Sequence, residues 1–221
     1  MTPEPEEKES KLETIVAILI AIVTVIGAVV AWRASVAADS AGDADFAGLQ
    51  ASLNAEETRA LNNVNAYEHY GAYVNYRRYL NLGNAIADDL ANDPSTPEDQ
   101  AFMLDRQRAE AYDLSNANQT LFPNRFLNRD GSYSVTRELG EAWADAAKQK
   151  DLDPDPHYAE ADGLRQKTNL LLATLSLLAI GLVFFTLVEA ADERLQMIMV
   201  GLGGAFSLVG TIIALVIEFT R

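Results

Sequence analysis

The chain of 221 residues contains no cysteine and only two histidines, His69 and His157. Without cysteine it can have no disulfide framework, no thiol nucleophile and no thiolate metal site. The histidines are not paired at helical spacing, and the sequence shows neither a serine nucleophile elbow nor a glycine-rich phosphate loop. We therefore expect no catalytic residue and no bound cofactor, and a protein that is not an enzyme.

Charged side chains are missing from three long apolar segments, residues 15–32, 170–188 and 197–217. A helix rises about 1.5 Å per residue, and roughly 20 residues cross a hydrocarbon layer about 30 Å thick. The first segment follows an acidic tail, residues 1–14, where a signal peptide would have a basic region. We predict three transmembrane helices, with the third extending over residues 197–219.

Trp32 and Arg33 end the first apolar segment, as is typical of an anchor at the membrane interface. Lysine and arginine near the ends of the three segments are almost evenly divided between the two sides, with a slight excess on the side of Arg33. The positive-inside rule then places the segment after Arg33 in the cytoplasm. We expect a multi-pass protein in the plasma membrane of a prokaryote.

Residues 33–168 form the expected extramembranous domain. They include 13 basic and 23 acidic residues, a net charge of −10, which disfavours nucleic acid and anionic lipid surfaces as partners. Apolar residues recur at intervals of three and four without an intervening proline, which predicts a long amphipathic helix, loosened near Gly42 and Gly48. The apolar stripe consists of Phe46, Leu49, Leu53, Ala60, Leu61, Val64, Tyr67, Val74, Leu82, Ile86 and Leu90.

A second helix is expected over residues 97–120, with Thr96 as its N-cap and Pro97 at its first position. Asp130-Gly131 then predicts a tight turn in a small β-hairpin or an ordered loop.

Helical character returns over residues 135–150, and a proline-rich linker precedes a helix that continues from His157 into the second apolar segment. Residues 189–196 join the last two segments and are too few for anything but an antiparallel hairpin. The predicted fold class is an all-α integral membrane protein, with three transmembrane helices and a long-helix, coiled-coil domain inserted between the first and second.

Two stretches, AYEHYGAYVNYRRYL and LRQKTNLLLATLSLLAIGLVFF, resemble parts of an uncharacterised family of three-span bacterial membrane proteins that carry a domain of unknown function. The resemblance covers most of the chain and implies no reaction and no named ligand. The order of spans is also similar to that of stator proteins, which couple proton flow to work. The paired spans depart from that pattern because they lack its glycine-rich and threonine-containing segments.

Five tyrosines recur at every third position of the long helix. At about 100° per residue they wind through about 240°, so they cannot all face one ligand. Large rings whose hydroxyls need partners indicate a helix packed between neighbours, in its own domain or in a second copy. An aromatic cage for a cation or a quinone is the alternative. The tyrosines are Tyr67, Tyr70, Tyr73, Tyr76 and Tyr79.

Small residues recur along the third apolar segment at Gly203, Ser207, Gly210 and Ala214. This spacing permits two helices to approach closely within a membrane. The partner is either the second apolar segment or another copy of the chain.

Asp151, Asp153 and Asp155 alternate in a pattern that can bind Ca²⁺, but a calcium loop needs glycine where this chain has Pro156. We expect solvated turns there and no metal.

We therefore expect a structural or scaffolding membrane component that forms homo-oligomers, lies in a lipid bilayer and contacts protein partners through its acidic domain, with no nucleic acid bound. Two alternatives stay open. One is a subunit of an oligomeric ion channel or stator-like transporter, whose pore would be lined by hydroxyls and backbone. The other is ligand sensing by the tyrosine-rich helix.

Overall fold

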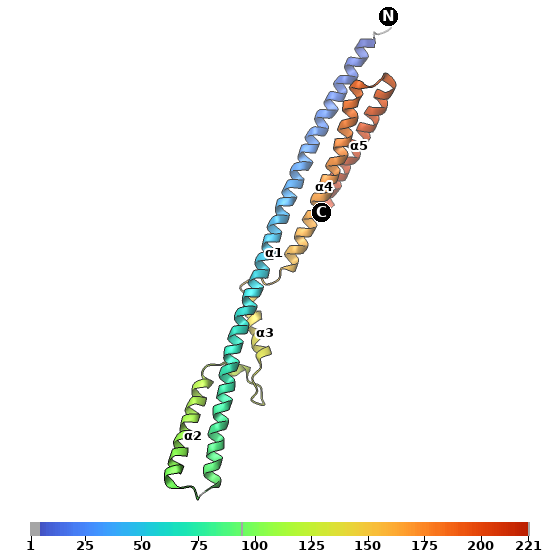
Figure 1. Ribbon diagram of the computed structural model, residues 1–221. Helices are drawn as coiled ribbons and strands as arrows, with labels where there is room; N and C mark the ends of the chain where they lie inside the picture. The colour runs from blue at the N-terminus through green and yellow to red at the C-terminus, as the bar shows by residue number, and fades with distance from the viewer. Residues whose placement is uncertain (1–4, 94, 221) are drawn as a thin grey trace. The chain divides into compact units, whose positions relative to one another are not determined.

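The computed structural model describes residues 5–93 and 95–220. Within them the chain is helical and has no strand, and the first four residues of the predicted acidic tail lie outside the described part. The elements are α1 (Pro5–Asn92), α2 (Glu98–Gln119), the 3₁₀ helix η1 (Asn124–Phe126), α3 (Val135–Ala146), α4 (Asp155–Leu187), the 3₁₀ helix η2 (Val188–Ala190) and α5 (Glu193–Thr220) (Figure 1).

Three helical segments are long and apolar enough to cross a membrane: Leu12–Asn92, Asp155–Ala190 and Arg194–Thr220. The predicted all-α class, with three helices of this kind, is confirmed.

Helix α1 passes through Gly42 and Gly48 without a break, so the predicted loosening at these glycines is wrong. A glycine inside a helix costs only about 1 kcal/mol relative to alanine, which a helix of this length easily tolerates. Gly48 instead permits a close approach, because a Cβ atom there would lie 2.8 Å from Cε1 of Tyr158.

Contacts divide the chain into two compact units. We call residues 1–50 with 154–221 the three-helix unit and residues 51–153 the inserted unit. The first contains the apolar part of α1 together with α4 and α5. The second contains the C-terminal part of α1 together with α2, η1 and α3.

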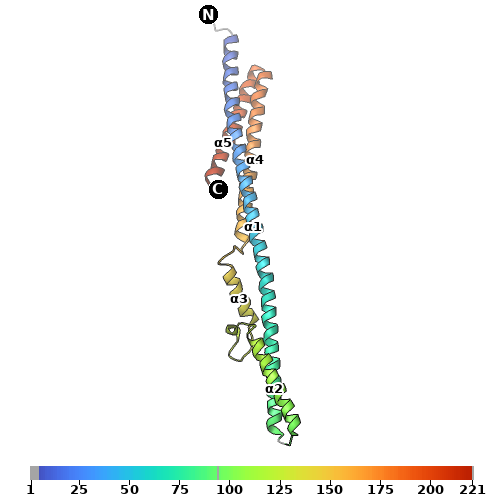
Figure 2. The same cartoon turned by 90° about the vertical axis from the view of Figure 1, so that its left-hand side faces the viewer.

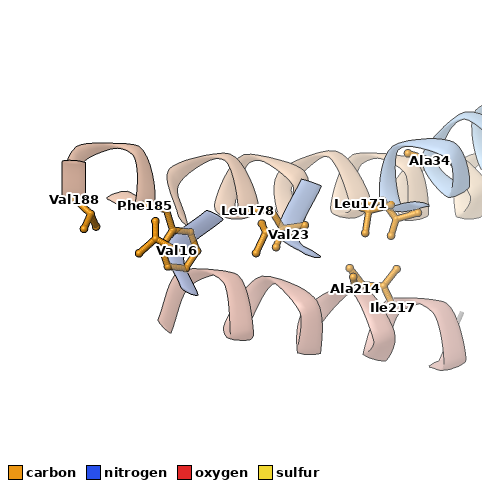
Figure 3. Close-up of a cluster of buried hydrophobic side chains, with 10 residues drawn as sticks. Val16, Val23, Ala34, Leu171, Leu178, Phe185, Val188, Ala214 and Ile217 are labelled. Atoms are coloured by element: carbon orange, nitrogen blue, oxygen red, sulfur yellow. The ribbon is translucent and has the colours of Figure 1, made fainter. Parts of the chain in front are cut away.

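The core of the three-helix unit is built on seven-residue spacing. Val16, Val23 and Val30 are buried on α1 and pack with residues of α4 and α5 in one cluster. The three core residues of α4 follow the same spacing in the opposite direction, so Val16 lies near Phe185 and Val23 near Leu178 (Figure 3). This repeat keeps one seam of each helix turned toward its neighbours, as in a coiled coil.

Helices α4 and α5 form an antiparallel hairpin and lie side by side in Figure 1, whereas in the view of Figure 2 α5 crosses α1. α4 ends at Leu187, and η2 leads into α5 at Glu193. The backbone N–H groups of Leu195 and Gln196 donate to the carbonyl of Asp192, at 2.7 and 2.9 Å, which secures the first turn of α5.

The buried side of α1 beyond its apolar segment consists mainly of alanine. Ala34, Ala37, Ala41 and Ala44 are all buried in the three-helix unit. Most of the larger residues that predicted this helix are exposed instead, and only Ile86 and Leu90 are half-buried. The predicted helix exists, but it packs through small side chains, which allow neighbouring helices to come close.

In the inserted unit α2 packs against the C-terminal part of α1. The ring of Tyr112 covers Gly83, where a Cβ atom would lie 2.6 Å from Cε1. The Ser115 hydroxyl donates to the Tyr76 carbonyl at 3.1 Å.

The predicted N-cap of the second helix is wrong. The Thr96 hydroxyl donates to the Asp93 carbonyl at 2.8 Å, so it is directed back toward the end of α1. α2 begins at Glu98, and Pro97 occupies the cap position without a side-chain hydrogen bond. α3 does have a side-chain N-cap, because the Ser134 hydroxyl accepts a hydrogen bond from the backbone N–H of Arg137.

The loop before α3 turns at Asp130-Gly131, as predicted, with Gly131 at a φ of 79°. It is an ordered loop rather than a hairpin of strands, since Leu127 and Tyr133 form only an isolated β-bridge. Hydrogen bonds from the hydroxyl and N–H of Ser132 lower the pKa of Asp130.

Candidate functional site

The small residues of α5 face α4 of the same chain. A Cβ atom on Gly203 would lie 2.8 Å from Cδ1 of Phe185 and 3.0 Å from the Gly181 carbonyl oxygen. One on Gly210 would lie 2.9 Å from Leu178 Cδ2. Ser207 and Ala214 are buried along the same side of α5. Of the two partners left open by the sequence, the structure shows the second apolar segment.

Gly181 is the residue of α4 that completes this contact. Its Cβ atom would lie 2.5 Å from Ser207 Oγ and 3.1 Å from the Gly203 carbonyl oxygen. The two backbones therefore touch at Gly181 and Gly203. Sequence reasoning missed Gly181, although it is the one glycine within an otherwise bulky apolar segment.

The five tyrosines have different surroundings. Tyr73 and Tyr76 enter an aromatic cluster, with ring centroids 5.7 Å from that of Phe122 in both cases. Tyr70 is exposed and its ring lies 6.1 Å from that of Tyr73. Tyr67 is 79% exposed, and the half-buried Tyr79 has the Arg78 guanidinium 6.0 Å from its ring centroid.

The aromatic cluster holds the loop before α3 against α1. Phe122, Phe126 and Tyr133 are buried in this cluster, and Tyr73, whose hydroxyl donates to the Gly131 carbonyl at 2.9 Å, packs against it. The Tyr73 and Tyr133 rings are stacked at 5.6 Å. Sequence reasoning noted the turn in this segment but not its aromatic residues as a packing unit.

Glu138 is a buried carboxylate that the sequence did not single out. It lies in the first turn of α3 and is only 6% exposed. Its Oε2 accepts a hydrogen bond from the Tyr133 hydroxyl at 2.9 Å, and its Oε1 contacts Nδ1 of His69. His69 is therefore a hydrogen-bonded packing residue, joined to a glutamate 69 positions away rather than to the adjacent Glu68.

Burial raises the pKa of Tyr133, and its hydrogen bond to Glu138 and the nearby negative charge raise it further. The hydroxyl therefore keeps its proton throughout the neutral range and remains a donor. A buried carboxylate needs such donors, because an unpaired charge away from water is costly. Glu138 thus ties three segments of the inserted unit together.

The weak metal candidates do not form a site in the described part of the chain, where no group of three or more acidic or histidine side chains could hold an ion. The Asp151 backbone carbonyl accepts a hydrogen bond from the Asn54 side chain at 3.3 Å. The Asp151 carboxylate accepts one from the backbone N–H of Asp153 at 3.0 Å. Asp155 is the first residue of α4. Asp151 and Asp153 are thus held within a turn.

Arg33 belongs to an ionic cluster that joins the three apolar helices at one end. Its guanidinium contacts Oε1 of Glu218 on α5, and Nζ of Lys167 on α4 lies 3.2 Å from Oε2 of the same carboxylate. The Lys167 contact is an ion pair rather than a well-directed hydrogen bond. Trp32 is exposed beside the cluster, with its ring centroid 5.8 Å from the Arg33 guanidinium.

Comparisons of the chain with known protein families, with curated proteins and with solved structures found no match.

Proposed function

We propose that the chain is an integral membrane protein whose helices α1, α4 and α5 cross a bilayer, and that it acts without catalysis as a structural or scaffolding component that associates with further copies of itself. The side of Arg33 is placed in the cytoplasm, following the distribution of basic residues.

The exposed face of the three-helix unit supports the membrane location. On α1, exposed aliphatic residues follow one another at intervals of three and four, beside the buried valines of the core. A continuous stripe of this kind is unfavourable in water and natural against lipid. The stripe consists of Ile15, Ile18, Ile22, Val25 and Val29.

The ends of the three helices also agree with this location. Arg33, Lys167 and Glu218 lie at one level of the bundle, each beside the end of a charge-free segment. Charged side chains collect where a transmembrane helix leaves the hydrocarbon, and exposed tryptophan is common at the same depth. The cluster therefore supports a membrane boundary at the same level for all three helices.

A second apolar seam on α1, in the inserted unit, is the observation that carries the scaffold proposal. Leu53, Ala60, Tyr67 and Val74 are seven residues apart, and Val64 lies between them. All five are exposed, Leu53 by 68% and Val64 by 55%. Repeats of seven with intermediate positions form the seam of a coiled coil.

This seam lies on the opposite side of α1 from the residues that the inserted unit buries. Leu53 is two residues from both buried Ala51 and buried Ala55, and Val64 is two residues from buried Ala66. Two residues correspond to about 200° around a helix. The seam is thus free within its own chain, and a second copy, whose α1 carries the same pattern, would cover it.

Cysteine cross-linking tests this association, because the chain has no cysteine of its own. In a symmetric pair anchored in one membrane, Val64 meets its counterpart, and a disulfide needs the two Cα atoms within about 7 Å. We expect the V64C variant to form a disulfide-linked dimer when membranes that contain it are oxidised.

The matched control is N65C, which is also exposed but lies about 100° around the helix from the seam. It should stay mostly monomeric under the same oxidation. If V64C forms no dimer, or if both variants cross-link equally, the seam does not join two copies.

A further inference from the structure

A groove between α1 and α5 opens on the face of the three-helix unit and ends at the ionic cluster. Its volume is about 270 Å³. Val25 and Val29 line it from α1, and Thr211 and Leu215 from α5, with Leu171 at its base. The Thr211 hydroxyl donates to its own helix, to the Ser207 carbonyl at 2.7 Å, so it offers the groove no free donor.

The groove has one polar end, formed by Arg33 and Glu218. Lys167 does not line the groove, but its Nζ lies 3.2 Å from Oε2 of Glu218, so the ionic cluster as a whole carries two positive charges and one negative charge. This local excess of positive charge contrasts with the net charge of −15 of the whole chain. Within the described residues the Arg33 guanidinium donates one hydrogen bond, to Glu218, and its side chain is 37% exposed. Because a guanidinium has five N–H donors, Arg33 can donate further hydrogen bonds to a ligand.

We propose that this groove binds one anionic phospholipid, with an acyl chain along Val25 and Val29 and the phosphate at Arg33. The inference rests on the proposed membrane location. The groove runs parallel to helices that cross the bilayer, and its charged end lies at headgroup depth, which is how a phospholipid is itself arranged. Basic pockets between transmembrane helices bind anionic headgroups for the same reason.

The excess of positive charge at this end of the groove favours an anionic lipid over a neutral one. Zwitterionic and anionic phospholipids both carry a phosphate, but only the anionic headgroup leaves its negative charge uncompensated.

Native mass spectrometry of the full chain released from mixed micelles tests the proposal, with phosphatidylglycerol and phosphatidylcholine supplied in equal amounts. We expect about fivefold preferential retention of phosphatidylglycerol, the ratio that one additional electrostatic contact near a lipid surface gives. R33Q should lose this preference. V29W, which fills the groove, should lose retention of both lipids.

The matched control is I22W, since Ile22 is on the same helix, is 50% exposed against 51% for Val29, and does not line the groove. I22W should retain phosphatidylglycerol like the unaltered chain. Equal retention of the two lipids by the unaltered chain would overturn the proposal, as would equal retention by V29W and I22W. If R33Q loosens the helix bundle, lipid retention by V29W is compared with retention by I22W, and a loss in V29W alone supports the groove as the binding site. A chain that never enters the membrane fraction would instead contradict the proposed function.

Discussion

Replacing Gly181 with leucine should force α4 and α5 apart and lower the free energy of unfolding of the three-helix unit by about 3 kcal/mol, the upper range for overpacking. Even a Cβ atom at Gly181 would lie 2.5 Å from Ser207 Oγ and 3.1 Å from the Gly203 carbonyl oxygen. The second of these is backbone and cannot move without moving α5. Association of helices in a membrane depends on such close packing. The loss is measured from thermal unfolding of the detergent-solubilised chain.

Gly204 is the matched control for this change. It lies next to Gly203 on α5, and a Cβ atom there meets nothing within 4 Å. G204L should therefore unfold close to the temperature of the unaltered chain. Equal destabilisation by G181L and G204L would show that added bulk, rather than the contact between the two backbones, causes the effect.

Replacing Glu138 with alanine should destabilise the inserted unit by about 3 kcal/mol, as expected when one partner of a buried polar group is removed. The Tyr133 hydroxyl would lose its acceptor in a buried position, and His69 would lose its only described hydrogen-bond partner. We expect faster proteolysis and faster amide hydrogen exchange over residues 122–146 in the full chain.

E141A is the control, because Glu141 lies one turn further along α3, is exposed and, among the described residues, forms a 3.5 Å ion pair with Arg125. Exposed ion pairs contribute about 1 kcal/mol or less. E138Q, which keeps an oxygen acceptor for Tyr133, should fall between the two. Protection in E138A that equals that of the unaltered chain would mean that the carboxylate does not hold α3 in place.

The apolar helices could be predicted because the signal is local. A charge-free run of about 20 residues in helical conformation already has the length of a span. The same local reasoning failed at Gly42 and Gly48, since a glycine looks the same in the sequence whether it loosens a helix or admits a neighbouring ring. Tyr158, the residue that explains Gly48, is 110 positions away.

The packing side of α1 shows a related limit. Large apolar residues such as Leu53 and Val64 dominate the hydropathy pattern, yet the helix buries Ala51 and Ala55. Alanine gives a weak signal in the sequence because it favours any helix, exposed or buried. The helix that packs against Gly203 could not be predicted either. The spacing of small residues shows that a close contact between helices is feasible, but it does not show which helix makes the contact.

Glu138 could not be recognised from the sequence. It is one of 32 acidic residues and stands in the first turn of a helix, where an exposed glutamate is common. Only the fold brings His69 and Tyr133 to its two oxygens. Burial of a carboxylate follows from tertiary contacts, and the local pattern holds no sign of them.

The most direct test of the account is the labelling of single cysteines in sealed vesicles by a membrane-impermeant maleimide. Ser95, between α1 and α2, and Ala190, in η2, are both exposed and are separated by the second span. If α1, α4 and α5 cross the bilayer, one of S95C and A190C is labelled in intact vesicles and the other only after the vesicles are opened. Equal labelling of both in intact vesicles would contradict the three crossings on which the proposed function rests.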